Sequence, residues 1–407
     1  MHPSLISIEE YNYDLPQEKI AVYPTQERHD SKLLIYKNKT IQETTFKYID
    51  KFLDNNSILI FNSSKVIQAR LKFLNNKKQS IEIFCLEPHL LNQDINQAMS
   101  KQNNTRWNCL VGNLKKWIEK EIVIVTNNIQ LSAQIVERYS THVCIDFKWE
   151  PSNLTFSEIL DYIGLMPIPP YIKRNSALID KSRYQTIYSD KIGSVAAPTA
   201  GLHFTEEVLN AINKKEIKTH AISLHVGAGT FKPVKSKMMQ GHDMHSEWIE
   251  VDLKLIIDLI ENKKKVISVG TTSLRVIESL YWMGLKTYKN DLITLVDLEI
   301  KQWEVYDLDD DKLNPNECLQ ALAKWMQKNK LEKLICRTQI LIAPPYQLKI
   351  CDGIITNFHQ PQSTLLLLIS AIVGENWKKI YQYAIQNNFR FLSYGDSSLL
   401  MKSDVKR

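Results

Sequence analysis

Apolar and polar positions follow two patterns along the chain outside residues 69–149. Apolar residues at helical spacing predict helices, and short continuous apolar runs predict strands that are covered on both faces. The predicted helices cover residues 206–215, 253–264 and 274–282, and the predicted strands cover residues 57–61, 219–226, 266–269 and 353–356. Strands that alternate with helices indicate an α/β layer architecture.

From about Ala69 to Trp149 the pattern changes to short β-branched segments separated by Asn-rich or Lys-rich breaks. These segments cover residues 80–86, 107–111, 121–125 and 142–147. They predict a small β-domain, a barrel, inserted into the larger unit. The predicted fold class is therefore α/β, with a larger mixed α/β domain (residues 1–68 and 150–407) interrupted by a smaller inserted β-barrel domain (residues 69–149).

The composition is that of a globular protein, with 407 residues of which 44% are hydrophobic and 24% charged. The net charge of +6 favours a polyanionic partner only modestly. The six cysteines form no Cys-x-x-Cys pair, which argues against a disulfide framework or a thiolate zinc site. The longest apolar run, residues 364–374, is too short to span a bilayer, and no leader pattern is visible. We therefore expect a cytoplasmic protein without membrane association.

A glycine and three hydroxyl residues separate a predicted strand from a predicted helix near the middle of the chain. Gly270 is followed by Thr271, Thr272 and Ser273, and Arg275 lies within the first turns of the helix. Free backbone N–H groups and hydroxyls at a helix N-terminus suit a carboxylate or a phosphate. Simple N-capping by Thr272 or Ser273 is the alternative.

Two histidine-containing segments offer further candidate groups. His225 is followed by Gly227 and Gly229, but no third glycine opens a helix there, so a dinucleotide-binding motif is excluded. These glycines admit a ligand or form a structural bulge. His245 and Glu247 lie in an alternating segment that predicts one shared strand face, for acid–base chemistry, substrate binding or an ordinary polar surface. No established metal signature organises this segment, so we predict no metal site.

Polar residues also cluster near the C-terminus. Asn357 and His359 follow the last predicted strand, and ligands of open α/β sheets bind at the carboxyl ends of strands. Arg390, Tyr394 and Asp396 combine a cation, an aromatic ring and a carboxylate. A structural histidine and a structural salt bridge are the respective alternatives.

A further candidate segment, residues 196–205, precedes these segments in the chain and contains Thr199, Gly201 and His203. Two N-terminal stretches, residues 13–16 and 61–66, complete the series. The series resembles the S-adenosylmethionine:tRNA ribosyltransferase-isomerase family of queuosine biosynthesis over nearly the whole chain. The resemblance implies transfer of the ribosyl group of S-adenosylmethionine to the aminomethyl-deazaguanine base at the tRNA wobble position. The implied products are epoxyqueuosine-tRNA, adenine and methionine.

The same resemblance implies that S-adenosylmethionine is a consumed substrate. The demands of the reaction require no cofactor, and we expect a monomer, although the sequence does not set the oligomeric state. The expected catalytic residues are His203, His225, His245, Glu247 and Asp396. The expected substrate-binding residues are Thr199, Gly201, Gly227, Gly229, Thr271, Thr272, Ser273, Arg275, Asn357, His359, Arg390 and Tyr394. His245 is the first choice for the base, because an imidazole titrates near neutral pH.

Residues 286–333 depart from the compact family pattern, with an acidic run and a helix expected at residues 316–328. We predict that they form a surface elaboration of the α/β domain. Two other classes of function stay open. Bound divalent metal would favour a nucleotide or phosphosugar hydrolase, and tight tRNA binding without adenine release would favour a non-catalytic RNA-binding module.

Overall fold

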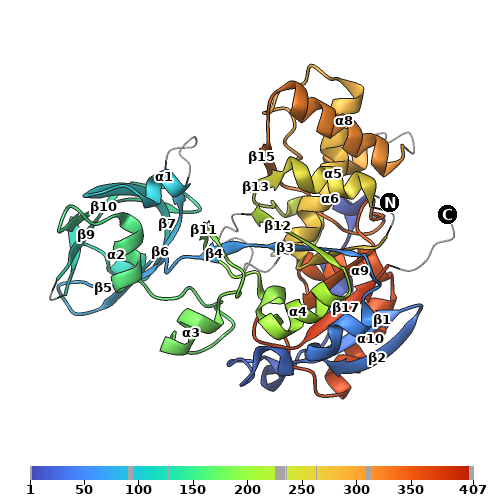
Figure 1. The fold of residues 1–407 in the computed structure, drawn as a ribbon. Coiled ribbons are helices and arrows are strands. Elements are labelled where there is room, and N and C mark those ends of the chain that lie inside the picture. The colour runs from blue at the N-terminus through green and yellow to red at the C-terminus, as the bar shows by residue number, and fades with distance from the viewer. Residues whose placement is uncertain are drawn as a thin grey trace.

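The structure is a computed structural model that describes residues 2–89, 95–126, 128–224, 234, 236–262, 264–308 and 313–402. A large α/β unit and a smaller β unit lie side by side (Figure 1). Between them β4 (Ser64–Val66) pairs in parallel with β11 (Lys191–Ser194). The large sheet contains strands that precede the smaller unit in the sequence and strands that follow it. Both parts of the chain therefore build one α/β unit.

The large sheet has nine strands among the described residues. In spatial order they are β15 (Lys333–Thr338), β13 (Glu247–Asp252), β12 (Lys218–Leu224), β3 (Ile58–Asn62), β14 (Val266–Val269), β16 (Gly353–Asn357), β17 (Ser397–Met401), β1 (Lys32–Lys37) and β2 (Thr40–Thr45). The central strands β12, β3, β14 and β16 run parallel. Their carboxyl ends therefore meet at one edge of the sheet.

Helices cover both faces of this sheet. One face packs against α5 (Leu253–Glu261), α6 (Thr271–Lys289), α8 (Pro315–Lys328), α9 (Thr364–Val373) and α10 (Asn376–Gln386), and the other against α4 (Glu206–Lys214) and a 3-10 segment, η5 (Phe46–Phe52). Along β1, Leu34 and Tyr36 enter the first core, whereas Leu33 and Ile35 enter the second. This two-residue alternation with apolar side chains on both sides is the pattern of a strand buried between two layers.

The smaller unit is an antiparallel sheet of six described strands whose outer strands approach each other like the sides of a barrel. Its order is β5 (Arg70–Leu74), β6 (Ser80–Pro88), β7 (Asn104–Gly112), β10 (Val143–Glu150), β9 (Gln130–Arg138) and β8 (Glu121–Val125). Trp107, Phe147 and Trp149 fill its own hydrophobic core. The predicted fold class, a mixed α/β unit with a smaller β-barrel, is confirmed.

Two strands of the barrel, β5 and β9, were not among the segments predicted from the sequence. The helix α2 (Phe156–Ile163) follows the expected boundary at residue 149, yet Phe156 packs against the rings of Trp107 and Trp149 in the barrel core. A short helix, α1 (Ile95–Met99), also contributes to this core. The exact domain boundaries stay predictions.

The segment from residue 286 onward packs closely on the α/β unit. Within it lie the end of α6, the short helix α7 (Glu304–Asp307) and α8. The contact between α6 and α8 depends on Gly284, where an added Cβ would lie 2.2 Å from the carbonyl oxygen of Cys318.

The carboxylate of Glu278 in α6 is fully buried and ties the helix to the segment that leads into β16. One oxygen accepts hydrogen bonds from the backbone N–H groups of Ile350 (3.0 Å) and Cys351 (2.9 Å). The other accepts from the Lys349 N–H (2.7 Å) and the Tyr346 hydroxyl (2.8 Å). Burial nevertheless raises the pKa of Glu278, because desolvation penalises the charged form.

We predict that Glu278→Gln lowers the free energy of unfolding by about 1–3 kcal/mol, because the amide NH₂ replaces an acceptor and leaves a buried N–H unpaired. Glu375→Gln is the matched control at an exposed carboxylate and should change stability by less than about 0.5 kcal/mol. Denaturant unfolding measures both. Equal stability of the two variants would contradict the assigned role of Glu278.

Candidate active site

A cleft lies at the edge of the large sheet where the central parallel strands end. It encloses about 930 Å³, including space open to solvent. Its lining comes from Tyr171, residues 196–200, residues 270–272, residues 356–360, Ser363, Thr364, Leu365, Leu392 and Ser393. A volume of this order accommodates a nucleoside-sized molecule.

Two helix N-termini face the cleft. Gly270, with φ of +90°, ends β14 and starts α6, and no side chain caps the helix there. Thr271 and Thr272 of its first turn line the cleft. The helix α9 begins at the same cleft, where Ser363 accepts a hydrogen bond from the Leu366 N–H (3.3 Å). Both N-termini present positive partial charge, which favours an anionic group in the cleft.

Ser273 and Arg275, predicted with Thr271 and Thr272, do not line the cleft. The Ser273 hydroxyl donates to the Val269 carbonyl oxygen (2.8 Å) inside the fold. Arg275 donates from Nη1 to Glu247 (2.5 Å) and from Nε to the Ile340 carbonyl oxygen (3.0 Å). Arg275 Nη2 is buried and has no hydrogen-bond partner among the described residues. The buried Arg275–Glu247 pair therefore ties α6 to the start of β13.

His245 and Glu247 do not share a strand face, so that prediction is wrong. The strand β13 begins at Glu247, which pairs with Thr338, and His245 precedes it as an exposed residue. The physical reason is that the backbone of Met244 bonds to side chains instead of a neighbouring strand. Its N–H donates to Gln302 Oε1 (2.9 Å), and its carbonyl oxygen accepts from another glutamine side chain.

A directed chain of hydrogen bonds runs through His203 to the cleft. His203 Nδ1 lies 2.8 Å from Ser31 Oγ, and its Nε2 lies 3.1 Å from Asn357 Nδ2. Two carbonyl oxygens set the direction, because the Ser31 hydroxyl donates to Arg28 O (3.4 Å) and Asn357 Nδ2 donates to Asp396 O (3.5 Å). His203 therefore carries its proton on Nδ1 and accepts at Nε2.

This direction leaves the Asn357 side-chain oxygen without a partner among the described residues, although it is buried. Asn357 lines the cleft from the end of β16. A buried acceptor without a hydrogen bond is costly, and an N–H donor of a ligand would satisfy it. His203 thus holds the Asn357 side chain in this orientation, and its contacts favour this positioning role over proton transfer.

His359 lines the cleft next to Asn357 and is held by three groups. Its Nε2 lies 3.1 Å from the Thr356 hydroxyl, and its backbone N–H donates to Tyr381 (3.1 Å). Its carbonyl oxygen accepts from the Tyr13 hydroxyl. Burial lowers the pKa of both His359 and His203 to about 3, so both imidazoles are neutral at physiological pH.

Arg390 and Asp396 form an ion pair in the segment directly before β17. The buried Asp396 carboxylate accepts from the backbone N–H groups of Lys32 (3.1 Å) and Arg390 (2.8 Å), and from Arg390 Nη2 (3.3 Å). Tyr394 donates to Asp180 (2.7 Å). These contacts hold the segment that precedes β17 in place. No observation tests the predicted catalytic role of Asp396, which stays a prediction.

The remaining predicted residues divide between the cleft and the rest of the fold. Thr199 lines the cleft. Gly201 makes room for packing, because a Cβ there would lie 1.8 Å from the Tyr188 hydroxyl oxygen. His225, Gly227 and Gly229 lie outside the described residues. Within the described ranges, no group of three His, Cys, Asp or Glu side chains is placed to hold a metal ion.

Sequence reasoning missed several residues of the cleft. Tyr171 carries no local signal, since only the fold brings it there. Leu392 and Ser393 lie between the predicted residues Arg390 and Tyr394 but were not predicted as site residues themselves. Ser363 had a readable signal, because a hydroxyl residue directly before an apolar helical run is typical of an N-cap.

Fold and cleft together define an α/β protein with a nucleoside-sized site at the carboxyl edge of parallel strands. Residues 8–400 match the family described as "Queuosine biosynthesis protein". The chain belongs to this family.

Relatives named S-adenosylmethionine:tRNA ribosyltransferase-isomerase match over nearly full length. Those from Halothermothrix orenii and Caldanaerobacter subterraneus subsp. tengcongensis are both 36% identical, covering 97% and 96% of this chain and 100% and 99% of theirs. One from Legionella pneumophila is 35% identical, covering 97% of this chain and 99% of its own. A solved S-adenosylmethionine tRNA ribosyltransferase from Thermotoga maritima is 24% identical, with a TM-score of 0.46, covering 96% of this chain and all of that one.

We predict that stability falls as the pH falls from about 6.5 toward 3. The unfolded chain binds protons on His203 and His359 in this window, whereas the folded chain does not. Each histidine should contribute a loss of about 1–2 kcal/mol between about pH 6.5 and about pH 5. Denaturant unfolding at several pH values measures this slope. His203→Gln should make the slope shallower, and an unchanged slope would contradict the buried, neutral state of His203.

Proposed function

We propose that the protein is an S-adenosylmethionine:tRNA ribosyltransferase-isomerase. It transfers and isomerises the ribosyl group of S-adenosylmethionine onto the aminomethyl-deazaguanine base at the tRNA wobble position. The products are epoxyqueuosine-tRNA, adenine and methionine. The observation that carries the proposal is the family match over residues 8–400, together with full-length relatives that bear this name.

The described cleft suits parts of this chemistry. The N-termini of α6 and α9 favour the carboxylate of the methionine moiety. Ala197, Phe358 and Leu392 provide apolar walls for a flat base, and the Asn357 oxygen can accept a hydrogen bond from an amino group. These placements are proposals that follow from the polarity of each part of the cleft.

The reaction needs a base, an acid and a polar environment for charge. A base removes a proton from the ribose carbon beside the sulfonium, whose positive charge acidifies that carbon. An acid assists the departure of adenine, and fixed dipoles stabilise the charges that develop. The reaction as written needs no external electrons, so we propose that S-adenosylmethionine is consumed without a further cofactor.

His245 remains our first candidate for the base. His203 has both ring nitrogens in hydrogen bonds, which leaves it poorly placed to take a proton. His245 is exposed and, among the described residues, lies outside the lining of the cleft. Its assignment therefore requires the ribose of S-adenosylmethionine to lie at the side of the cleft toward the start of β13, within reach of His245.

None of the described helices has the length and apolar character that crossing a membrane requires. A cytoplasmic location and a monomeric state stay part of the proposal.

The deciding experiment is incubation of the protein with S-adenosylmethionine and precursor tRNA. Chromatography and mass spectrometry would detect adenine, methionine and the modified nucleoside. Release of all three in equal amounts supports the proposal. Tight tRNA binding without adenine release would instead favour a non-catalytic RNA-binding module.

We predict that His245→Ala folds normally, binds both substrates and loses single-turnover adenine release by about 100-fold or more, as expected for a general base. His142→Ala, at a half-buried position directly before the barrel strand β10, is the control and should retain activity. Near-normal adenine release by His245→Ala would eliminate this assignment.

We predict that Asn357→Leu lowers kcat/KM by about 10–100-fold, because it removes the buried acceptor at a similar side-chain volume. Ser31→Ala acts on the same amide only through His203 and should cause a smaller loss, which Ser31→Thr restores. Steady-state kinetics measures all three variants. Equal losses in Asn357→Leu and Ser31→Ala would argue against direct contact between Asn357 and the substrate.

A further inference from the structure

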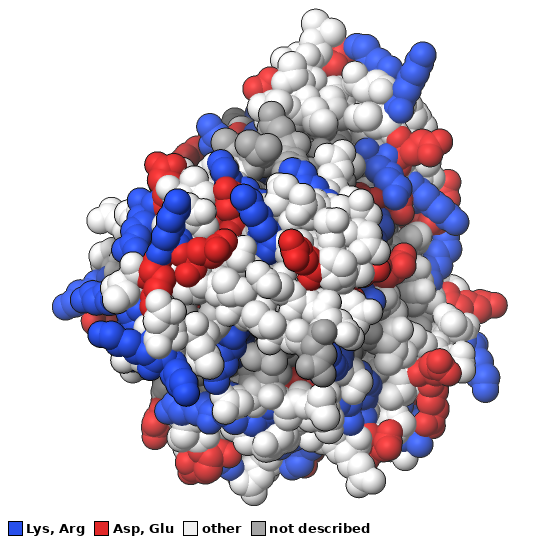
Figure 2. Space-filling view, turned by 90° about the vertical axis from the view of Figure 1, so that its left-hand side faces the viewer, with Lys and Arg blue, Asp and Glu red and all other residues white. Residues whose placement is uncertain are grey.

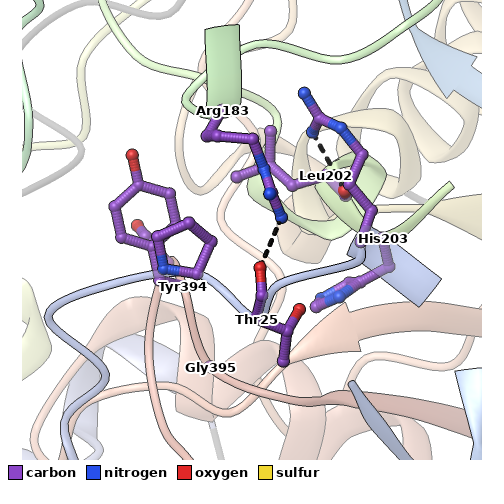
Figure 3. Close-up of a pocket in the computed structure, with 9 residues that line it drawn as sticks. Thr25, Arg183, Leu202, His203, Tyr394 and Gly395 are labelled. Carbon is purple, nitrogen blue, oxygen red and sulfur yellow. Dashed lines mark hydrogen bonds between the residues drawn. The ribbon is translucent and has the colours of Figure 1, made fainter. Parts of the chain in front are cut away.

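A second pocket lies beside the cleft and shares Ser393 with it. Its volume is about 250 Å³, including space open to solvent, and it is lined by Pro24, Thr25, Arg28, Arg183, Leu202, His203, Ser393, Tyr394 and Gly395. Figure 3 shows Arg183 reaching from α3 (Leu178–Arg183) to Thr25, between Tyr394 on one side and His203 on the other. Leu202 and His203 belong to the same short turn, η7 (Thr199–His203), as Thr199 of the cleft. The two cavities therefore lie next to each other, because η7 and Ser393 contribute to the lining of both.

The two arginines of this pocket bind neutral backbone groups. Arg28 donates to the carbonyl oxygens of Leu202 (3.1 Å) and Ser182 (2.6 Å). Arg183 donates to those of Thr25 (2.7 Å) and Gln26 (2.7 Å). Carbonyl groups orient a guanidinium but do not neutralise it. Arg183 Nε is buried and has no partner among the described residues.

The carboxylates near this pocket are already paired with other arginines. Both oxygens of the buried Asp180 accept hydrogen bonds from Arg174, at 2.7 and 2.8 Å. Asp396 is paired with Arg390. In the described part of the chain, no acidic side chain forms an ion pair with Arg28 or Arg183, so the pocket holds two uncompensated positive charges.

The other polar groups beside Arg28 and Arg183 do not cancel their positive charge. His203 is neutral at physiological pH, and Tyr394 donates its hydroxyl to Asp180. Burial and the like charge of Arg183 lower the pKa of the Arg28 guanidinium. Two like charges held together at a cost in free energy are typical of a site that an anion completes.

We propose that Arg28 and Arg183 bind a phosphodiester group of the tRNA backbone, next to the nucleotide whose base enters the cleft. This inference rests on the proposed function. Guanidinium groups match the oxygens of a phosphate and can contact them through two N–H groups at once. A wobble base must leave its stack to reach an enclosed site, and its phosphate then has to be held beside that site.

The wider surface explains why a local site is needed. On the face that carries the barrel, Lys and Arg side chains are interspersed with Asp and Glu instead of forming one uniform basic surface (Figure 2). The net charge of +6 is small for 407 residues. Broad electrostatic attraction is therefore modest, and two oriented arginines beside the cleft supply attraction where position matters.

The test measures binding of an unmodified anticodon stem-loop RNA, which needs no turnover. Arg28→Gln and Arg183→Gln should each weaken binding about tenfold and lower the slope of log Kd against log salt concentration by about 0.7–0.9. The KM for S-adenosylmethionine should stay within about twofold of wild type in both variants. Arg138→Gln, an exposed arginine on the barrel strand β9, is the matched control and should retain affinity and slope.

Lysine variants keep the test decisive if a glutamine variant unfolds. Arg28→Lys and Arg183→Lys retain the charge, so the salt slope should stay near wild type while affinity falls. Unchanged RNA affinity and slope in the folded variants would overturn the proposal. A raised KM for S-adenosylmethionine with unchanged RNA binding would also overturn it, because the bound oxyanion would then be the methionine carboxylate. Arginine-dependent RNA binding without ribosyl transfer would refute the proposed function and leave this site standing.

Discussion

The buried carboxylate of Glu278 holds the centre of the α/β unit together, because the elements on two sides of the cleft converge on it. It accepts hydrogen bonds from the backbone N–H groups of residues 349–351, which lie directly before β16. The next residue, Asp352, fixes the start of β16 to the start of β14, with its N–H donating to Val266 O (2.7 Å) and its carboxylate accepting from Val266 N (2.9 Å). Asn357 is thereby brought to the same cleft as Thr271, at the N-terminus of the helix that carries Glu278. A buried carboxylate of this kind is stable only when its donors are all in place.

The cleft uses burial to keep its imidazoles neutral. A neutral His203 can accept a hydrogen bond from Asn357, and this contact turns the asparagine oxygen away from the histidine. A protonated His203 could not accept there, so the same low pKa that makes the imidazole a weak base preserves the direction of these hydrogen bonds. His359 is held near the cleft in the same neutral state by the Thr356 hydroxyl. Both histidines thus contribute fixed dipoles, which cost no reorganisation when charge develops in a bound substrate.

Four arginines of the α/β unit divide into two pairs with different consequences. Arg275 is paired with a buried carboxylate, and this pair fixes the packing of α6 on β13. Arg174 is likewise paired with Asp180. Arg28 and Arg183 are held by carbonyl groups and keep their charge uncompensated. The first group stabilises the fold, and the second leaves positive charge that the proposed phosphate would neutralise. That charge lies next to the cleft because η7 lines both cavities.

The sequence alone determined the layer class, the smaller β-barrel, the four central parallel strands of the large sheet and the helices α4, α5, α6 and α8, because these depend on local apolar periodicity. It also placed Thr271, Asn357 and His359 at the ends of strands, where the cleft indeed lies. Tertiary structure decided which polar residues face the cleft. Ser273 and Glu247 have chemistry suited to a site, yet hydrogen bonds inside the fold occupy them. The pairing state of an arginine depends on residues far away along the chain, as Arg28 and Leu202 show, and no local pattern records it.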